Sequence, residues 1–273
     1  MFQAEPFLRW AGGKTWLIKH LSNVIGDSKI NHYHEPFLGG AAIFFSMETH
    51  YKSYLSDVNE ELISTYSAVK ENPHAVIESL LQFSNTKEDY YRVRSMDFDN
   101  LYERAAQFIY LNQTSFNGIY RVNRNGKYNV PYGFRTNMVY DMNRIIEASK
   151  KLQNVRLSHG DFTCNKYRIK QNDLVFLDPP YTVSHNNNGF IEYNKNLFSL
   201  DDQHRLSGFI DFIKKKKAYY ILTNAAHPVI LEIFDKNDQI LTLSRSSLIG
   251  GTHATRGTTQ EYIFTNIQNG VTL

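Results

Sequence analysis

Cysteine is almost absent from this chain, which has only Cys164 among its 273 residues. One thiol cannot form an internal disulfide, and it cannot build a zinc site from several thiolates. This scarcity fits a reducing compartment, and we expect Cys164 itself to be a spectator thiol.

Long apolar runs are also absent, although 42% of the residues are hydrophobic. No stretch approaches the roughly 18 uninterrupted apolar residues of a membrane-spanning helix, so we expect a soluble protein without a membrane partner. The first ten residues include Glu5 and Arg9 and lack the apolar core of a secretory signal. We therefore predict a cytoplasmic location.

The sequence has no strong excess of charge of either sign. A net charge of +3 and a pI near 8.7 permit a polyanionic partner but do not demand one. The run from Lys214 to Lys217 resembles a nucleic-acid patch, yet it ends an apolar-periodic segment, where cations suit a helix C-terminus. We interpret it as a solvated helix end.

Periodicity places strands near both ends of the chain and helices between them. The expected strands are 33–36, 53–56, 155–158, 173–177, 218–223, 239–243 and 261–265, and the expected helices are 14–24, 40–50, 60–70, 73–83, 87–95 and 102–111. This order predicts an α/β fold with a Rossmann-like, doubly wound sheet built from residues 1–58 and 155–273. Residues 59–154 would form an inserted, mainly helical domain.

The most informative pattern is the DPPY turn, Asp178-Pro179-Pro180-Tyr181, which directly follows the apolar run 174–177. In an open α/β sheet, ligands bind beyond the carboxyl ends of the strands, where this turn would lie. Two prolines make the turn stiff, so its carbonyls can face a ligand. The carboxylate and one carbonyl would accept both hydrogens of an adenine amine and free its lone pair for attack, while Tyr181 offers a flat face to a base held outside a duplex.

The DPPY turn resembles the catalytic motif of amino-methyltransferases, and nearly the whole chain resembles the Dam-type, D12 class, DNA adenine-N6 methyltransferases. Further matches follow in the family's order at residues 7–14, 35–40, 57–59, 117–121, 129–133 and 160–162. The resemblance implies a methyltransferase sheet and S-adenosylmethionine as cofactor. It also implies methylation of the adenine N6 amine in double-stranded DNA by base flipping, with Asp178, Pro179, Pro180 and Tyr181 as the catalytic residues.

A second group of motifs suits a nucleoside cofactor. Residues 35–40 read as a strand end followed by paired glycines, and Asp57 closes the next strand about twenty residues later, a separation typical of an acid that binds ribose hydroxyls. Taken alone, these features also suit an ordinary turn and a helix N-cap. The resemblance implies that the cofactor contacts Trp10, Lys14, Glu35, Pro36, Phe37, Gly39, Asp57, Asp161, Phe162 and Asp178, with Asp57 at its ribose and Asp161 and Phe162 at its adenine.

Two other sites fit the sequence poorly. Gly13-Lys14-Thr15 lacks the first glycine of a phosphate loop, since Leu8 stands at that position. His32 and His34 would form an i, i+2 pair on a strand, but no third ligand stands at a recognisable spacing. We therefore expect neither an NTPase nor a metal site, and methyl transfer from a sulfonium needs no metal.

The reading segment, residues 112–135, interleaves aromatic residues with Arg121, Arg124, Lys127 and Arg135. Arginines hold phosphates or read guanine, and aromatic rings stack at opened base steps. A surface hairpin around Asn125-Gly126 is compatible with this role. By resemblance we assign DNA binding to Arg9, Phe116, Asn117, Ile119, Arg121, Asn123, Arg124, Asn129 and Pro131, with a GATC target, while a longer site remains open.

Other activities remain possible at this stage. Methylation of a protein glutamine or an RNA adenine uses similar four-residue motifs, but Asp178 in place of Asn disfavours the first and the reading segment disfavours the second. A non-catalytic DNA-binding module would not need Lys14, Asp57 and Asp178. The expected partner is GATC-containing double-stranded DNA, bound by a monomer. The resemblance also leaves room for a cognate restriction endonuclease that accompanies the enzyme. Residues 245–256 either contact phosphate or form a plain loop.

Overall fold

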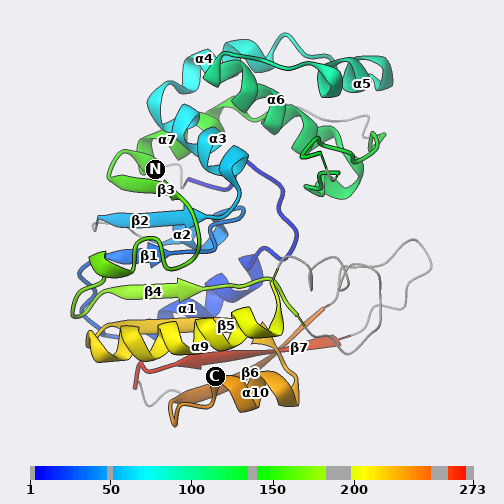
Figure 1. The fold of residues 1–273 in the computed structure, drawn as a ribbon. Helices are drawn as coiled ribbons and strands as arrows, with labels where there is room; N and C mark the ends of the chain where they lie inside the picture. Colours follow the sequence, from blue (N-terminus) through cyan, green and yellow to red (C-terminus); the bar gives the residue numbers. More distant parts are fainter. Residues whose placement is uncertain are drawn as a thin grey trace. The chain divides into compact units, whose positions relative to one another are not determined.

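The computed structural model describes residues 4–47, 52–123, 125–134, 140–182, 198–246 and 258–268. The chain divides into two compact units, the first made of residues 1–15 and 38–164 and the second of residues 16–37 and 165–273. Both units combine strands with helices (Figure 1), which confirms the α/β prediction. The proposed site residue Arg124 and most of the loop 245–256 lie outside the described residues.

The described residues of the second unit form five strands, in the order β1 (Tyr33–Glu35), β4 (Leu174–Leu177), β5 (Tyr219–Ala225), β7 (Thr258–Thr265) and β6 (Gln239–Ser246). β1, β4 and β5 are parallel, with Tyr33 opposite Leu174 and Leu174 opposite Tyr219. β7 runs antiparallel to both of its neighbours. The carboxyl ends of three parallel strands therefore share one edge, the edge at which α/β sheets bind ligands.

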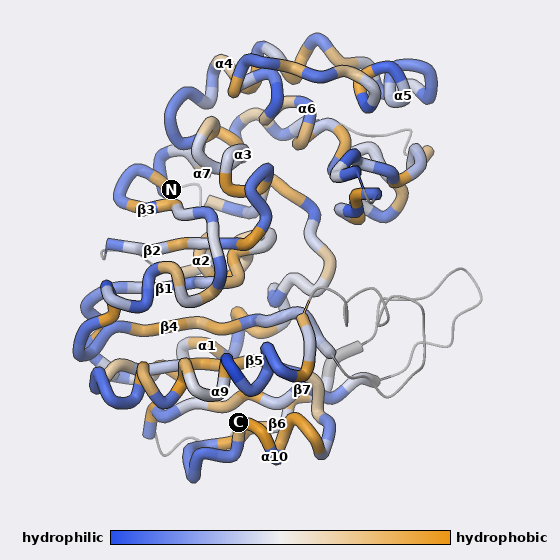
Figure 2. Tube along the Cα trace, in the orientation of Figure 1, coloured by the Kyte–Doolittle hydropathy of each residue, from blue (hydrophilic) through white to orange (hydrophobic). Residues whose placement is uncertain are grey.

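Helices α1 (Ile18–Ile25), α9 (Leu200–Lys215) and α10 (Pro228–Phe234) belong to the same unit, with the short turn η3 (Lys166–Arg168), while the turn η1 (Thr15–Leu17) begins at the last residue of the first unit's N-terminal segment. α9 packs on β5 and begins at a capping box formed by Ser199 and Asp202. Its last turn holds Lys214 and Lys215, so the interpretation of this basic run as a helix end is confirmed. Figure 2 shows β4 as a hydrophobic strand, and all four of its residues are buried.

The first unit contains a parallel pair, β2 (Ser53–Asp57) and β3 (Val155–His159), in register from Ser53 opposite Val155 to Asp57 opposite His159. α2 (Ala42–Ser46) precedes β2. The connection between the two strands runs through α3 (Glu60–Glu71), α4 (Pro73–Leu80), α5 (Lys87–Ser95), α6 (Leu101–Thr114), η2 (Phe116–Gly118) and α7 (Met142–Leu152). The expected helical content of residues 59–154 is thus present, while the limits of a separate recognition domain stay a prediction.

Local sequence signals explain where these helices begin. Asn59, Asn72, Thr86 and Asn100 each accept a hydrogen bond from a backbone N–H in the first turn of the helix that follows. The helices then pack on one another, α3 and α4 both against α6. In the described part of the chain, none of the helices has the length and apolar composition needed to cross a bilayer.

Candidate functional site

The DPPY turn leaves β4 at the ligand-binding edge of the second unit. The hydroxyl of Thr223, a fully buried residue of β5, donates to Asp178 Oδ1 at 2.8 Å. β5 pairs with β4, so this donor is supplied by the neighbouring strand. The hydrogen bond restrains the orientation of the Asp178 carboxylate.

The other end of the turn is also held. Tyr181 donates its hydroxyl hydrogen to Glu261 Oε2 at 2.5 Å. The next residue, Thr182, donates to the Phe198 carbonyl and accepts from the Gln203 amide at 2.8 Å. A carboxylate acceptor and an aromatic face are thus presented by one rigid tetrapeptide.

The end of β1 lies at the same edge, because β1 and β4 are parallel neighbours. Glu35 is buried and its Oε2 accepts from the Tyr33 hydroxyl at 2.8 Å. Burial raises the pKa of Tyr33 well above its usual value, with the Glu35 charge adding to the shift. The ring of Phe37 packs edge to face on that of Phe198, with the ring centroids 5.6 Å apart. The structure therefore brings the predicted Glu35, Pro36 and Phe37 to the edge from which the DPPY turn departs.

In the first unit, Trp10, Gly39 and Asp57 form a second cluster. The Gly39 N–H donates to Asp57 Oδ2 at 3.0 Å, and the Gly39 carbonyl accepts from the Tyr66 hydroxyl. Gly39 has a φ of +47°, and a Cβ built there would lie 2.8 Å from Trp10 Cδ1. Only glycine permits this close approach of backbone to indole, so the Gly39–Gly40 turn forms a cradle that the Trp10 side chain fills.

Asp57 lies at the carboxyl end of β2 beside the residues after β3. Burial raises the pKa of Asp57 above 3.8, against the opposing effect of backbone N–H donors that include Gly39 and Asn59. The N–H of Gly160 donates to the Asp57 carbonyl at 3.0 Å, which places Asp161 and the buried Phe162 next to this strand end. The Asp161 carboxylate accepts from both the backbone and the hydroxyl of Thr163, so it also stabilises its own turn.

Lys14 is buried, with its Nζ donating to the Gly12 carbonyl at 2.8 Å. Its amino group therefore lies within the motif of residues 7–14 and does not extend into solvent. This position agrees with the cofactor role implied for Lys14, which stays a prediction.

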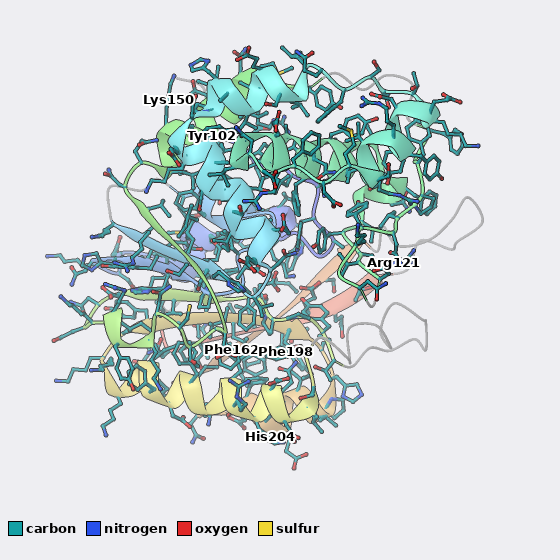
Figure 3. The ribbon with its side chains drawn as sticks, turned by 45° about the horizontal axis from the view of Figure 1, so that its top comes forward. Tyr102, Arg121, Lys150, Phe162, Phe198 and His204 are labelled. Atoms are coloured by element: carbon teal, nitrogen blue, oxygen red, sulfur yellow. The ribbon has the colours of Figure 1, made fainter. Side chains whose placement is uncertain are left out.

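The reading segment folds as the expected hairpin around Asn125-Gly126. The Asn123 N–H donates to the Lys127 carbonyl at 2.8 Å, and Val122 pairs antiparallel with Tyr128. Nearer the base, the Phe116 N–H donates to the Pro131 carbonyl at 2.9 Å. In Figure 3, Tyr102 marks the first turn of α6, and Arg121 lies past the other end of that helix.

Side chains at the predicted DNA-binding positions are largely open to solvent. Phe116 is 53% exposed, and Asn117, Arg121, Asn123 and Pro131 are exposed as well. Asn117 and Gly118 both have positive φ, which gives the tight turn that projects Phe116. Arg121 Nε donates to Asn129 Oδ1 at 2.8 Å, so its guanidinium is held by the opposite arm of the hairpin.

Arg9 is tied to this segment by backbone and side-chain contacts. The side chain of the buried Asn112 accepts from the Arg9 N–H at 2.8 Å and donates to the Arg9 carbonyl at 2.7 Å. A Cβ on Gly118 would lie 2.7 Å from Arg9 Cβ. Trp10 stacks on Tyr120 with ring centroids 5.6 Å apart. Within the first unit, Trp10, a proposed cofactor contact, therefore packs directly against Tyr120 of the reading segment.

His32 directly precedes β1 and His34 lies within it. His32 Nδ1 and His34 Nε2 each lie 3.0 Å from one oxygen of the buried Asp173 carboxylate, just before β4. Burial lowers the pKa of His34, although Asp173 opposes the shift. Spacing did not reveal this acidic partner because 139 residues separate it from His34.

Comparisons with known proteins agree on one family of enzymes. Residues 10–247 match the family model of the D12 class N6 adenine-specific DNA methyltransferases. The type II methyltransferase M1.LlaDCHI of Lactococcus lactis is 34% identical over 97% of this chain and 96% of its own length. M.MjaIII of Methanocaldococcus jannaschii is 36% identical over 82% of this chain and 85% of its own length, and a Vibrio cholerae DNA adenine methylase is 29% identical over 81% of each. The expected resemblance is confirmed, and the chain belongs to the D12 class of N6 adenine-specific DNA methyltransferases.

Proposed function

We propose that this chain transfers the methyl group of S-adenosylmethionine to the N6 amine of adenine in GATC sites of double-stranded DNA, after the adenine has left the helix. The observation that carries the proposal is the DPPY turn at the end of β4, with its Asp178 carboxylate hydrogen-bonded to Thr223. The Asp178 carboxylate, which would accept hydrogens of the amine, and the Tyr181 ring, which would stack on the base, therefore lie close together in one unit.

The chemistry assigned to the turn follows from the weakness of the nucleophile. The adenine amine is a poor nucleophile because its lone pair is delocalised into the ring. Asp178 and a carbonyl of the turn accept the two amine hydrogens, which favours a pyramidal nitrogen with its lone pair available. Tyr181 holds the base by stacking. The cofactor, when bound, would supply a methyl group activated on a sulfonium. As the N–C bond forms, the S–C bond would break, a neutral thioether would leave, and the amine would lose one proton to solvent.

The cofactor assignment retains the residues that the sequence suggested in both units. In the first unit these are Trp10, Lys14, Gly39, Asp57, Asp161 and Phe162. In the second they are Glu35, Pro36, Phe37 and Asp178. The glycine cradle against Trp10 supports this assignment, since a Cβ at residue 39 or 40 would lie less than 3.0 Å from the Trp10 side chain. Asp57 supports it as well, because a buried carboxylate at a strand end suits ribose hydroxyls.

The GATC proposal rests on the reading segment. Arg121 is exposed and oriented by Asn129, an arrangement that suits bidentate contact with guanine. Phe116 projects from its turn and would fill the space that a flipped adenine leaves. Both roles are assigned from the resemblance to GATC-methylating members, with the exposure of these side chains in support.

We propose further that the enzyme acts as a monomer in the cytoplasm. Two of its relatives are named type II methyltransferases, which supports pairing with a cognate restriction endonuclease that cuts the same site.

Base flipping and site choice are tested together with 2-aminopurine placed at the adenine of a GATC duplex. Extrusion of this base from the stack should raise its fluorescence when the protein is added, and single-base changes in GATC should suppress the rise. A signal that survives such changes would refute the GATC assignment. If the protein methylates the matching adenine duplex but gives no signal on the 2-aminopurine duplex, flipping would be refuted. Asp178→Asn is the matched control, since it should flip the base and fail to methylate the unmodified duplex.

A further inference from the structure

We propose that Glu261 is a positioning residue for methyl transfer, which sets the ring plane of Tyr181 against the target base. The inference rests on the proposed function, and no motif used above includes Glu261. Its direct support is the hydrogen bond from the Tyr181 hydroxyl to Glu261 Oε2 at 2.5 Å.

The location of Glu261 is unusual for an acid. Its side chain is completely buried, although burying a carboxylate costs several kcal/mol unless partners compensate for the lost water. A hydrophobic residue of similar volume would serve the packing of β7 at least as well. The acid at this position is therefore explained better by what it holds than by the stability of the sheet.

The strand order brings Glu261 to the edge where the DPPY turn lies. β7 pairs with β5, and Glu261 stands opposite Ala225, two residues beyond the Thr223 that binds Asp178. Two adjacent strands thus hold the two functional side chains of one turn. Thr223 fixes the carboxylate at its start, and Glu261 fixes the phenol at its end.

The anchor supplies a constraint that the prolines cannot. Pro179 and Pro180 restrict the backbone, but they leave both side-chain torsions of Tyr181 free. A stacked base needs a ring of defined orientation, and ordering the ring only on binding would cost side-chain entropy. Holding the hydroxyl orders the ring beforehand, so we expect Glu261 to act on the base-holding step and not on cofactor binding.

Four variants test this inference. Glu261→Leu removes the acceptor, Glu261→Gln keeps a neutral one, Tyr181→Phe removes the donor, and Glu261→Leu/Tyr181→Phe removes both. Gln260→Ala, at the exposed neighbouring position of β7, is the control. We expect Glu261→Leu to lower kcat/KM for a GATC duplex by about tenfold or more, with the dissociation constant for S-adenosylmethionine unchanged. Glu261→Gln should restore most of the loss.

The decisive comparison is between Tyr181→Phe and the double variant. If Glu261 acts through the phenol, Tyr181→Phe alone lowers kcat/KM to a similar degree, and the double variant is hardly worse. Independent losses that multiply, or Glu261→Leu with wild-type kcat/KM, would overturn the inference while leaving the proposed function intact. If Glu261→Leu does not fold, a Tyr181→Phe protein with undiminished kcat/KM overturns it equally. A wild-type protein that methylates no DNA would instead refute the proposed function, and the inference with it.

Discussion

A methyl group added at residue 39 would strike the indole of Trp10. In Gly39→Ala, the new Cβ would lie 2.8 Å from Trp10 Cδ1 and 2.9 Å from Nε1, on a backbone with φ of +47°. The left-handed conformation costs a non-glycine residue about 1–2 kcal/mol. Overpacking against the ring adds about 1–3 kcal/mol unless the indole moves away.

Either response of Trp10 has a measurable result. If the indole stays, the protein loses stability by the sum of both terms, which the usual 5–15 kcal/mol of a folded domain can absorb. If the indole moves, it leaves the proposed cofactor position. We expect the second response to dominate and to weaken binding of S-adenosylmethionine by at least tenfold, about 1.4 kcal/mol.

Gly126→Ala is the matched control for this substitution. Gly126 has a φ of +74°, but nothing lies within 4 Å of the Cβ it would carry. The control should lose about 1–2 kcal/mol of stability and keep its affinity for the cofactor. Calorimetric titration with S-adenosylmethionine and thermal melts measure both quantities. Gly39→Ala protein that melts like the control and binds the cofactor like wild type would refute the cradle.

Three further substitutions test other contacts. Thr223→Val keeps the shape of the side chain but removes the donor to Asp178, so kcat should fall about tenfold with cofactor binding retained, and an unchanged kcat would remove Thr223 from its role. Because burial raises the pKa of Asp57 above 3.8, this carboxylate takes up its proton at a higher pH than a free aspartate does on acidification. Affinity for S-adenosylmethionine should therefore fall as the pH drops through the folded pKa, whereas Asp57→Asn should bind weakly without this dependence, and the same acid profile in both would argue against a ribose contact. Arg121→Ala should reduce discrimination between GATC and its single-base variants by about 1–3 kcal/mol, as measured by kcat/KM on each duplex, and an unaltered site preference would exclude Arg121 as a reader.

Much of the fold could be predicted because its local signals agree with its packing. Residues 87–95 were predicted as a helix and form α5 with the same bounds, since Thr86 caps its first turn. Strands β6 and β7 extend further than predicted, to Ser246 and from Thr258. Their outer residues are polar and show no apolar alternation, so the antiparallel pairing there depends on backbone hydrogen bonds that periodicity does not reveal.

The site was predictable only in part, because its motifs are local in the sequence but the residues that hold them are not. The DPPY turn, the paired glycines and Asp57 are short motifs with a recognisable order along the chain. Their partners are remote in sequence: Thr223 comes 45 positions after Asp178, and Glu261 comes 80 positions after Tyr181. Such pairs depend on which strands become neighbours, and the order β4, β5, β7 cannot be read from local patterns.

The central claim is tested most directly by incubating the protein at low salt with labelled S-adenosylmethionine and two duplexes that differ by one GATC site. Low salt matters because phosphate contacts weaken steeply as ionic strength rises. We expect label on the GATC duplex alone, recovered as N6-methyladenine and absent with Asp178→Ala. Equal label on both duplexes would contradict the GATC site, and no label on either would contradict the methylation of duplex DNA itself.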